Sequence, residues 1–221
     1  MLRWFVLVLS VVTCLNVNAS ANLRLLHDAD INEWEPQVFS GKSIYTLREH
    51  KGRKALQALS NSSASGLVLK KKIDLSATPY LNWSWLAEKQ LLALDERSKS
   101  GDDFVARVYL VIDGGLRVWR TKSLSYVWSS NQDQGVVWDN AFAGSKVKMM
   151  SIKGKDAKTG EWHEEKRNVY QDLIDVFGDK GSEAANLKTY QYIDVIAIMT
   201  DTDNSEKEAE SYYGDIEFSV K

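Results

Sequence analysis

The sequence predicts a mostly β fold: a single-domain antiparallel β-sandwich of jelly-roll type with one or two short helices. Short stretches alternate between apolar and polar residues, are rich in Val, Ile, Tyr and Trp, and are separated by clusters of Gly, Asp, Asn and Ser. This is the pattern of half-buried strands. With two prolines, no internal repeat and no low-complexity linker in 221 residues, the chain is expected to form one domain over residues 22–221.

The first 21 residues have the features of a signal peptide. Arg3 gives a positive start, residues 4–15 form an apolar run too short to span a bilayer comfortably, and an Ala-Ser-Ala sequence ends at Ala21. We therefore predict export, with cleavage after Ala21. The short run disfavours a retained membrane anchor. A lipid anchor on Cys14 is disfavoured because a threonine precedes it.

Composition excludes several classes of protein and partner. Cys14 is the only cysteine, so the exported chain would have none, and a packed core must stabilise it in place of disulfides. The formal net charge is −2 without any basic block, so nucleic acid is not an expected partner. No second long apolar segment follows the signal peptide, so no transmembrane segment is expected after cleavage.

The predicted strands run the length of the chain. They lie near residues 43–49, 64–74, 80–86, 103–113, 115–120, 123–129, 146–152, 192–200 and 211–220. Between two of them, the glycines at 114 and 115 indicate a tight turn, because glycine reaches positive φ at little cost. Trp83 and Trp85 alternate on one face of their strand, where core packing is the favoured interpretation.

One helix is expected near residues 169–177. Val169, Leu173 and Phe177 recur at helical spacing. Asn168 is a candidate N-cap, and Gly178 stands where a glycine often ends a helix. A further helical turn is expected within residues 88–99.

Two strands have one apolar and one polar face. In the first, the apolar side is Phe104, Ala106, Val108, Leu110 and Ile112, and the other side is Asp103, Val105, Arg107, Tyr109 and Val111. In the second, the apolar side is Tyr212, Ile216, Phe218 and Val220, and the other side is Tyr213, Asp215 and Glu217. If both polar faces belong to one sheet, they form a surface that can bind a polar ligand.

An acidic segment follows the strand at 192–200. Asp201, Asp203 and Asn204 offer oxygen atoms of the kind that Ca²⁺ prefers, and Asp215 on the next strand could add a carboxylate. The alternative is a hairpin turn in which these side chains bind their own backbone. Arg107 could neutralise the acids in place of a metal.

Other polar and aromatic residues have two interpretations each. Asp103, with its neighbour Asp102, is either a ligand-binding acid or part of a solvated turn, and the turn is favoured for Asp102. Trp128 and Trp162 stand at the edges of loops, where they could stack on a ligand. Arg167 precedes a helix, where a positive charge opposes the dipole; it either binds an acidic ligand or forms an internal ion pair with one of the acidic turns.

Familiar catalytic motifs are missing from the sequence. Pro36 stands where a phosphate-binding loop needs its first glycine, and Arg167 stands where a zinc-protease helix needs its second histidine. There is no Gly-x-Ser-x-Gly elbow, and the three histidines share no ligand spacing. Nucleophilic and zinc-dependent hydrolysis are therefore not expected.

Six blocks of sequence are distinctive as a set. They are "WEPQVFSGKSIYTL", "SASGLVLKKKIDLSATPYLNWSW", "ERSKSGDDFVARVYLVI", "YVWSS", "EKRNVYQDL" and "IAIMTDTDNSEKEAESYYGDIEF". From Trp34 to Phe218 the chain resembles a family of secreted bacterial proteins catalogued as domain of unknown function 3047. The resemblance implies a bacterial protein exported to the periplasm, and it implies no activity. The pattern is also similar to carbohydrate-binding jelly rolls with a structural calcium, a likeness of fold only.

The expected function is non-catalytic binding of a glycan or cell-envelope polymer. The predicted ligand-binding residues are Asp103, Arg107, Tyr109, Trp128, Tyr213 and Asp215. One alternative is a glycan hydrolase or lyase that uses Asp103 or Asp215 as acid or base. Another is a structural partner in an envelope assembly.

Overall fold

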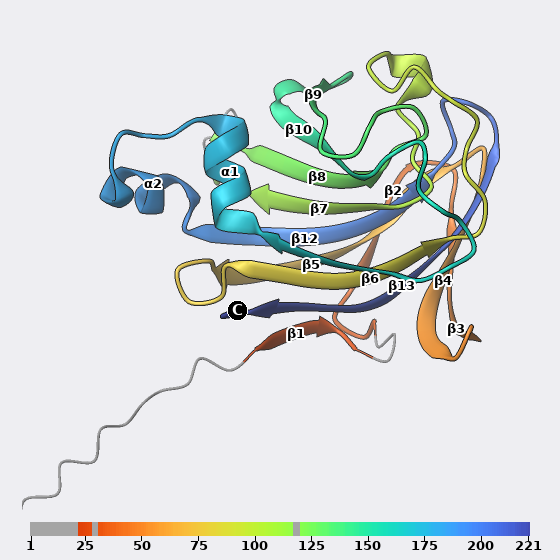
Figure 1. Cartoon of the computed structure of the whole chain (residues 1–221), viewed down its shortest axis with the longest axis horizontal. Helices are drawn as coiled ribbons and strands as arrows, with labels where there is room; N and C mark the ends of the chain where they lie inside the picture. Colours follow the sequence, from red (N-terminus) through yellow and green to blue (C-terminus); the bar gives the residue numbers. More distant parts are fainter. Residues whose placement is uncertain (1–21, 28–30, 117–119) are drawn as a thin grey trace, which may run out of the picture.

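Two β-sheets packed face to face make up most of the chain (Figure 1). A computed structural model describes residues 22–27, 31–116 and 120–221. The predicted signal peptide lies outside the described residues, as do positions 117–119 of the predicted strand 115–120. In the described part of the chain, no helix is long and apolar enough to cross a membrane.

The two sheets differ in width. The six-stranded sheet has the order β11 (His163–Asn168), β6 (Tyr80–Ala87), β13 (Glu208–Ser219), β4 (Arg53–Asn61) and β3 (Ile44–His50), with β1 (Leu23–Leu26) paired to β13. The seven-stranded sheet has the order β2 (Glu35–Ser40), β5 (Ala64–Asp74), β12 (Tyr192–Asp201), β7 (Arg107–Ile112), β8 (Lys122–Trp128), β10 (Gly144–Lys153) and β9 (Val137–Asn140). Pairing is antiparallel except between β8 and β10, which run parallel. The predicted mostly β sandwich is therefore confirmed.

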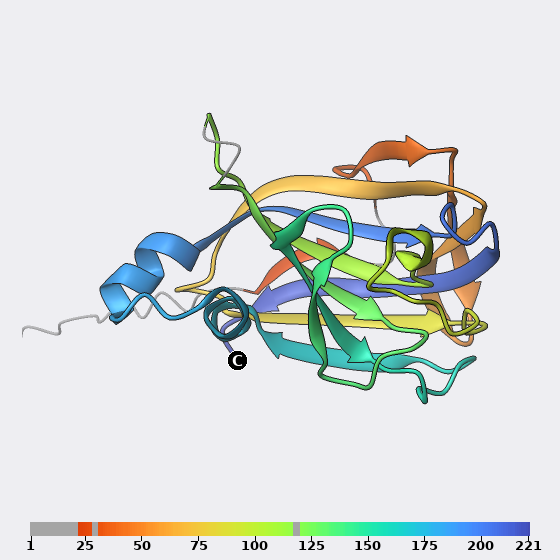
Figure 2. The same cartoon turned by 90° about the horizontal axis from the view of Figure 1, so that it is seen from above.

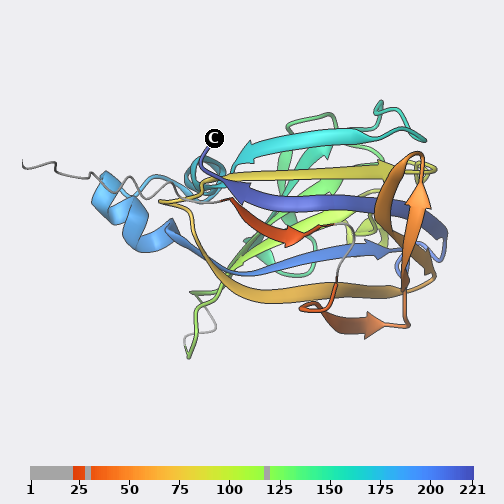
Figure 3. The same ribbon diagram turned by 90° about the horizontal axis from the view of Figure 1, so that it is seen from below.

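The two sheets face each other (Figures 2 and 3). The core lies between them, and side chains of both sheets contribute to it. Val108 and Leu110 enter it from the seven-stranded sheet and are fully buried, as the alternation of their strand predicts. Trp83 of the six-stranded sheet stacks on Tyr126 of the seven-stranded sheet, with ring centres 5.3 Å apart. Trp85 packs beside Trp83, so both tryptophans are core residues as expected.

The predicted helix is present and ends as expected. Helix α1 spans Val169–Phe177, and the Asn168 side chain accepts a hydrogen bond from the Gln171 N–H. Gly178 follows with φ of 88°, a conformation that favours glycine. Arg167 forms an internal ion pair, but its partner is Asp172 in the first turn of the helix and not, as had been predicted, one of the acidic turns. This pairing offsets the unfavourable position of a cation near a helix N-terminus.

Some elements were missed or misplaced. The strands β1, β2, β4, β9 and β11 were not predicted. Strand β2 is exposed along its whole length, and β11 (HEEKRN) is polar, so neither has the apolar alternation that identifies a strand. Helix α2 (Glu183–Tyr190) was also missed. The helical turn expected within residues 88–99 was wrong, because only a short 3-10 turn at Lys99–Gly101 is present.

A bulge in β13 exchanges the predicted faces of Tyr212 and Tyr213, whereas Ile216 and Phe218 face the core as predicted. Tyr213 pairs with Trp85, and Ile216 pairs with Trp83, so β13 carries one extra residue between these positions. An extra residue shifts every later side chain to the other face. Tyr213 and Ile216 are therefore both fully buried in the core, whereas Asp215 is exposed on the outer face. The prediction that Tyr213 and Asp215 share a face was wrong.

Candidate functional site

A groove of about 480 Å³ crosses the outer face of the seven-stranded sheet. Strand register builds its floor. Val68, Ala197 and Tyr109 are cross-strand neighbours on β5, β12 and β7, and Gly66, Met199 and Arg107 form the next row. Residues two apart on a strand share a face, so Tyr109 and Arg107 both lie on the groove side. Most of the floor is apolar.

Two phenylalanines flank the groove. Phe39, on the edge strand β2, is 68% exposed, and Phe142, in the turn between β9 and β10, is 57% exposed. The ammonium group of Lys99 lies 5.3 Å from the centre of the Phe142 ring. Together with the apolar floor, these two rings give the groove a largely apolar lining.

One end of the groove is charged. Arg107 forms an ion pair with Asp201, and the two side chains are only 4% and 1% exposed. Asp102 lies 3.9 Å from the same guanidinium and accepts hydrogen bonds from the Asn140 amide at 3.1 and 3.0 Å. The Nε of Arg107 has no hydrogen-bond partner within the described part of the chain. Arg107 thus neutralises a buried acid and keeps one donor unused.

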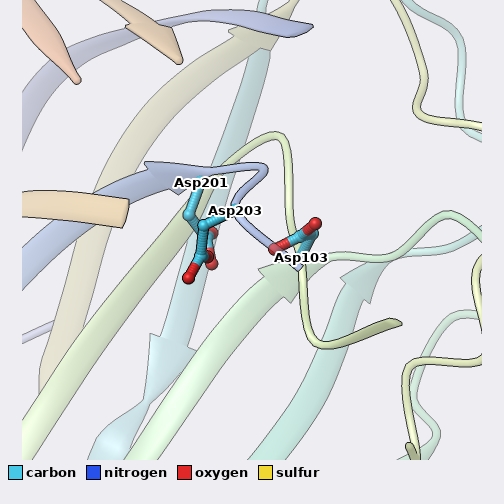
Figure 4. Close-up of side chains that lie close together, drawn as sticks. All are labelled: Asp103, Asp201 and Asp203. Atoms are coloured by element: carbon cyan, nitrogen blue, oxygen red, sulfur yellow. The ribbon is translucent and has the colours of Figure 1, made fainter. Parts of the chain in front are cut away.

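The remaining acids surround the connection after β12. Asp103 is fully buried and accepts hydrogen bonds from the backbone N–H groups of Asn204 (3.2 Å) and Ser205 (2.6 Å) and from the Asn204 amide (3.1 Å). Oxygens of Asp103, Asp201 and Asp203 lie within 4.8 Å of one another (Figure 4). Asp103 therefore holds the loop in place and does not line the groove.

Burial affects two carboxyl groups at this end. Burial raises the pKa of Asp102, although the Arg107 charge opposes the rise. Burial and the nearby Asp103 charge raise the pKa of Asp203. Both pKa shifts have the same cause. Several carboxyl groups lie close together, are shielded from water and have one nearby cation, Arg107.

The acidic segment is not a hairpin. Strand β12 belongs to the seven-stranded sheet and β13 to the six-stranded sheet, so the segment between them crosses from one sheet to the other. Figures 1 and 2 show this crossing at the end of the sandwich opposite the helices. The Thr202 N–H bonds the Ser63 carbonyl oxygen at 2.9 Å. Because the strands part here, Asp215 lies away from the acids of this segment.

The predicted site residues are therefore divided among three places. Arg107 and Tyr109 lie on the groove face, and burial raises the pKa of Tyr109 to about 12. Tyr213 is behind the floor: its hydroxyl donates to the Met199 carbonyl oxygen at 2.7 Å and accepts from the Arg107 N–H at 3.2 Å. Asp215 lies on the opposite outer face, 2.9 Å from the His27 ring nitrogen.

Trp128 is a core residue, in contrast to the prediction. It is 1% exposed and packs against Trp85 and His163. The residues that follow Trp128 are attached to another loop: Ser129 and Ser130 donate hydrogen bonds to the buried Glu96 carboxylate. These bonds hold the loop around Glu96 over the end of the strand.

Sequence reasoning missed Phe39, Phe142 and Asn140 and favoured a solvated turn for Asp102, which is buried at the groove. The available signal was weak. Each phenylalanine is a single aromatic residue two positions from a glycine, and such residues are common in loops. Only the fold brings them to one groove.

Solved structures match the chain at low identity, with TM-scores below 0.5. The Endo-D glycoside hydrolase domain from Streptococcus pneumoniae R6 is 11% identical, with 85% of this chain and 22% of that chain covered and a TM-score of 0.38. A carbohydrate-binding module of the β-sandwich superfamily is 11% identical (86% and 58% covered, TM-score 0.41). The xyloglucanase domain of the effector NopAA from Sinorhizobium fredii is 11% identical (85% and 93% covered, TM-score 0.47).

These likenesses describe the fold alone. The chain spans less than two thirds of the first two structures. No curated protein matches the chain. A family model does match, over residues 32–217, and its description is "Protein of unknown function (DUF3047)". Since this match covers most of the 221 residues, the chain belongs to the DUF3047 family.

Proposed function

We propose that the groove on the seven-stranded sheet binds a glycan or cell-envelope polymer and that the protein does not alter it chemically. The observation that carries the proposal is the buried Arg107, whose Nε donor is unused at the charged end of a groove flanked by exposed aromatic rings. A buried donor without a partner is costly. An oxygen atom of a bound ligand would satisfy it.

Sugar rings fit both halves of this groove. Their C–H faces pack on aromatic and aliphatic surfaces such as Phe39, Phe142 and Tyr109. Their hydroxyl groups both accept and donate hydrogen bonds, so they can accept from Arg107 and donate to carboxylates such as Asp203. A groove of about 480 Å³ is within the usual size range of small-ligand sites.

Export supports a polymer of the cell envelope as the ligand. The signal peptide expected in residues 1–21 would carry the chain to the periplasm. In that compartment the accessible polymers are glycans and glycan-linked chains. Periplasmic localisation is part of the proposal, and cell fractionation with an antibody against the protein tests it.

The placement of Asp103 and Asp215 does not support hydrolysis by this pair. The alternative enzyme would use Asp103 or Asp215, but Asp103 is engaged with backbone N–H groups and Asp215 is on the other sheet. Two carboxyl groups must flank one glycosidic bond for hydrolysis. Asp103 and Asp215 do not flank a common groove.

Calcium binding by Asp201, Asp203 and Asn204 stays a prediction. Asp201 already pairs with Arg107, and the Asn204 amide donates to Asp103 and Asp203. These contacts favour Arg107 as the group that neutralises Asp201. Asp203 has the most free capacity for a cation.

Calorimetric titration with soluble oligosaccharides tests the proposal. Phe39→Ala and Phe142→Ala should each weaken binding about tenfold without lowering the melting temperature, because both side chains are largely exposed. Leu47→Ala is the matched control, since Leu47 is 55% exposed on the other sheet. Equal loss in Leu47→Ala, or no binding to a broad glycan panel, would remove the groove as the site. Release of reducing ends during incubation would instead indicate hydrolysis.

A further inference from the structure

We propose that the polymer bound in the groove carries free amino groups on its sugar units, an inference that rests on the proposed function. The charged residues among the described lining of the groove are Asp102, Asp201, Asp203 and Arg107. Three carboxylates thus share one guanidinium. A ligand that adds positive charge would complete this arrangement.

The individual contacts show where a positive charge of a ligand would bind. Arg107 is committed to Asp201 by a direct ion pair, and its distance to Asp102 is 3.9 Å. Asp102 otherwise receives neutral amide donors from Asn140, and Asp203 receives one from Asn204. Asp102 shares the Arg107 guanidinium with Asp201, and Asp203 has no ion pair within the described part of the chain. An ammonium group beside them would gain a charge-assisted hydrogen bond.

The unused donor of Arg107 is a separate observation, and it also indicates a ligand. Arg107 is 3% exposed, lines the groove, and has no hydrogen-bond partner for Nε among the described residues. On a 2-amino sugar, the amine and a hydroxyl group stand on adjacent carbon atoms. The amine can donate to a carboxylate of the groove while the hydroxyl oxygen accepts from Arg107.

The same charges exclude two other classes of sugar. A uronic acid would place a fourth carboxylate among Asp102, Asp201 and Asp203, and like charges at close range are destabilising. An N-acetylated sugar has no cation and adds an acetyl group at the position where the amine would bind. Neutral sugars can pack on Phe39 and Phe142 but add no positive charge beside Asp102 and Asp203.

Three oligosaccharides with the same β-1,4 linkage separate these cases: the hexamers of glucosamine, N-acetylglucosamine and glucose. They differ at carbon 2, which carries an amine, an acetamide or a hydroxyl group. Calorimetric titration at pH 6 should show the glucosamine hexamer binding at least tenfold more tightly than the other two. Raising NaCl from 0.05 to 0.5 M should reduce this preference, because salt screens charge interactions.

Variants locate the preference in the groove. Asp203→Asn and Asp102→Asn should each lower the affinity for the glucosamine hexamer several-fold more than the affinity for the glucose hexamer, because only the amine loses an ionic partner. Asp215→Asn, on the outer face of the six-stranded sheet, is the matched control and should bind as the native protein does. Circular dichroism confirms that each variant is folded.

The outcomes separate the inference from the proposed function. If the glucose hexamer binds as tightly as the glucosamine hexamer, and Phe39→Ala weakens both, the groove binds glycans and the amino-sugar inference is wrong. If glucosamine binding is insensitive to Asp102→Asn and Asp203→Asn, or equally sensitive to Asp215→Asn, the inference is also wrong. If none of the three hexamers nor any member of the wider panel binds, the proposed function itself fails.

Discussion

The two outer faces of the sandwich both carry a hollow, but the charged side chains of one are largely exposed to water and those of the other are largely buried. The hollow on the six-stranded sheet has a volume of about 680 Å³, and its charged lining is Arg24, Arg53, Lys54, Glu49, Glu164, Asp215 and Glu217. Arg53 pairs with Glu164, and Arg24 lies 3.8 Å from Glu217. These side chains are largely exposed, so water and neighbours of opposite charge stabilise them.

The groove on the seven-stranded sheet is apolar along its floor, and its charges are buried at one end. Arg107 and Asp201 are almost inaccessible to water, so their interaction is little screened and each depends on the other. The comparison teaches that a large charged hollow can be a solvated surface. A smaller groove with buried, unevenly matched charges is the better candidate for ligand binding.

Removing the arginine from each face should give the largest contrast. Arg107→Ala leaves the buried Asp201 without its cation and is expected to lower the free energy of unfolding by about 3–5 kcal/mol. Arg53→Ala removes an exposed pair and should cost less than about 1 kcal/mol. Urea unfolding of both variants measures the difference. Equal effects would show that the Arg107 pair contributes no more than a surface pair.

Adding a methyl group in each sheet should give the next effect. In Gly66→Ala the new Cβ would lie 2.6 Å from the Ile198 carbonyl oxygen, so backbone must shift, at about 1–3 kcal/mol. In Gly214→Ala the nearest atom is the Ser84 hydroxyl oxygen, which can rotate away. Thermal unfolding should therefore rank Gly66→Ala as the less stable variant, and the reverse order would contradict the packing described for β5 and β12.

A smaller effect is expected from pH. The pKa of Asp203 is raised in the folded protein, so the folded state holds this proton more tightly than the unfolded chain. Its contribution to stability is complete below the unfolded pKa, about 3.9, and is lost as pH rises through the folded pKa. The charged groups near it are Asp102, Asp103, Asp201 and Arg107.

Asp203→Asn should therefore match the native protein in stability at pH 3 and exceed it at pH 7. Urea unfolding at both pH values measures the difference. Asp215→Asn on the other face is the control, because that exposed carboxylate should change the free energy of unfolding by less than about 0.5 kcal/mol at either pH. A native protein more stable than Asp203→Asn at pH 7 would contradict the described environment of this acid.

The smallest effect is expected from calcium. Extracellular calcium sites have dissociation constants of about 10⁻⁴ to 10⁻³ M. With a constant near 1 mM, 1 mM Ca²⁺ would stabilise the folded state by about 0.4 kcal/mol. Thermal unfolding with EDTA and then with Ca²⁺ measures this shift, which Asp203→Asn should abolish and Asp215→Asn should retain. A shift that survives Asp203→Asn would place the cation elsewhere.

Much of the fold could be predicted because its causes are local. Alternation in the strand at 103–113 separates Val108 and Leu110 from Arg107 and Tyr109, and the structure keeps that separation. Helix α1 has its apolar period and both caps within a few residues. A strand's pleat and a helix's turn are set by the chain itself, so these patterns are visible in the sequence.

The candidate site was predicted only in part, since its remaining members depend on pairing. A bulge opposite Trp83 and Trp85 buries Tyr213 and exposes Asp215. The loop around Glu96 covers the strand end at Trp128. Neither event leaves a local signal, because each depends on a partner segment far away in the sequence.

The sequence by itself thus determined the sandwich class, the capped helix, the core positions of Trp83 and Trp85 and the groove-facing positions of Arg107 and Tyr109. Only the tertiary structure decided that β12 and β13 enter different sheets, that Arg107 pairs with Asp201, and that Phe39 and Phe142 flank the same groove. The physical reason is the separation along the chain of the residues that interact. Side-chain alternation follows from each strand's own backbone, whereas a site is made by the register and order of strands that are distant along the chain.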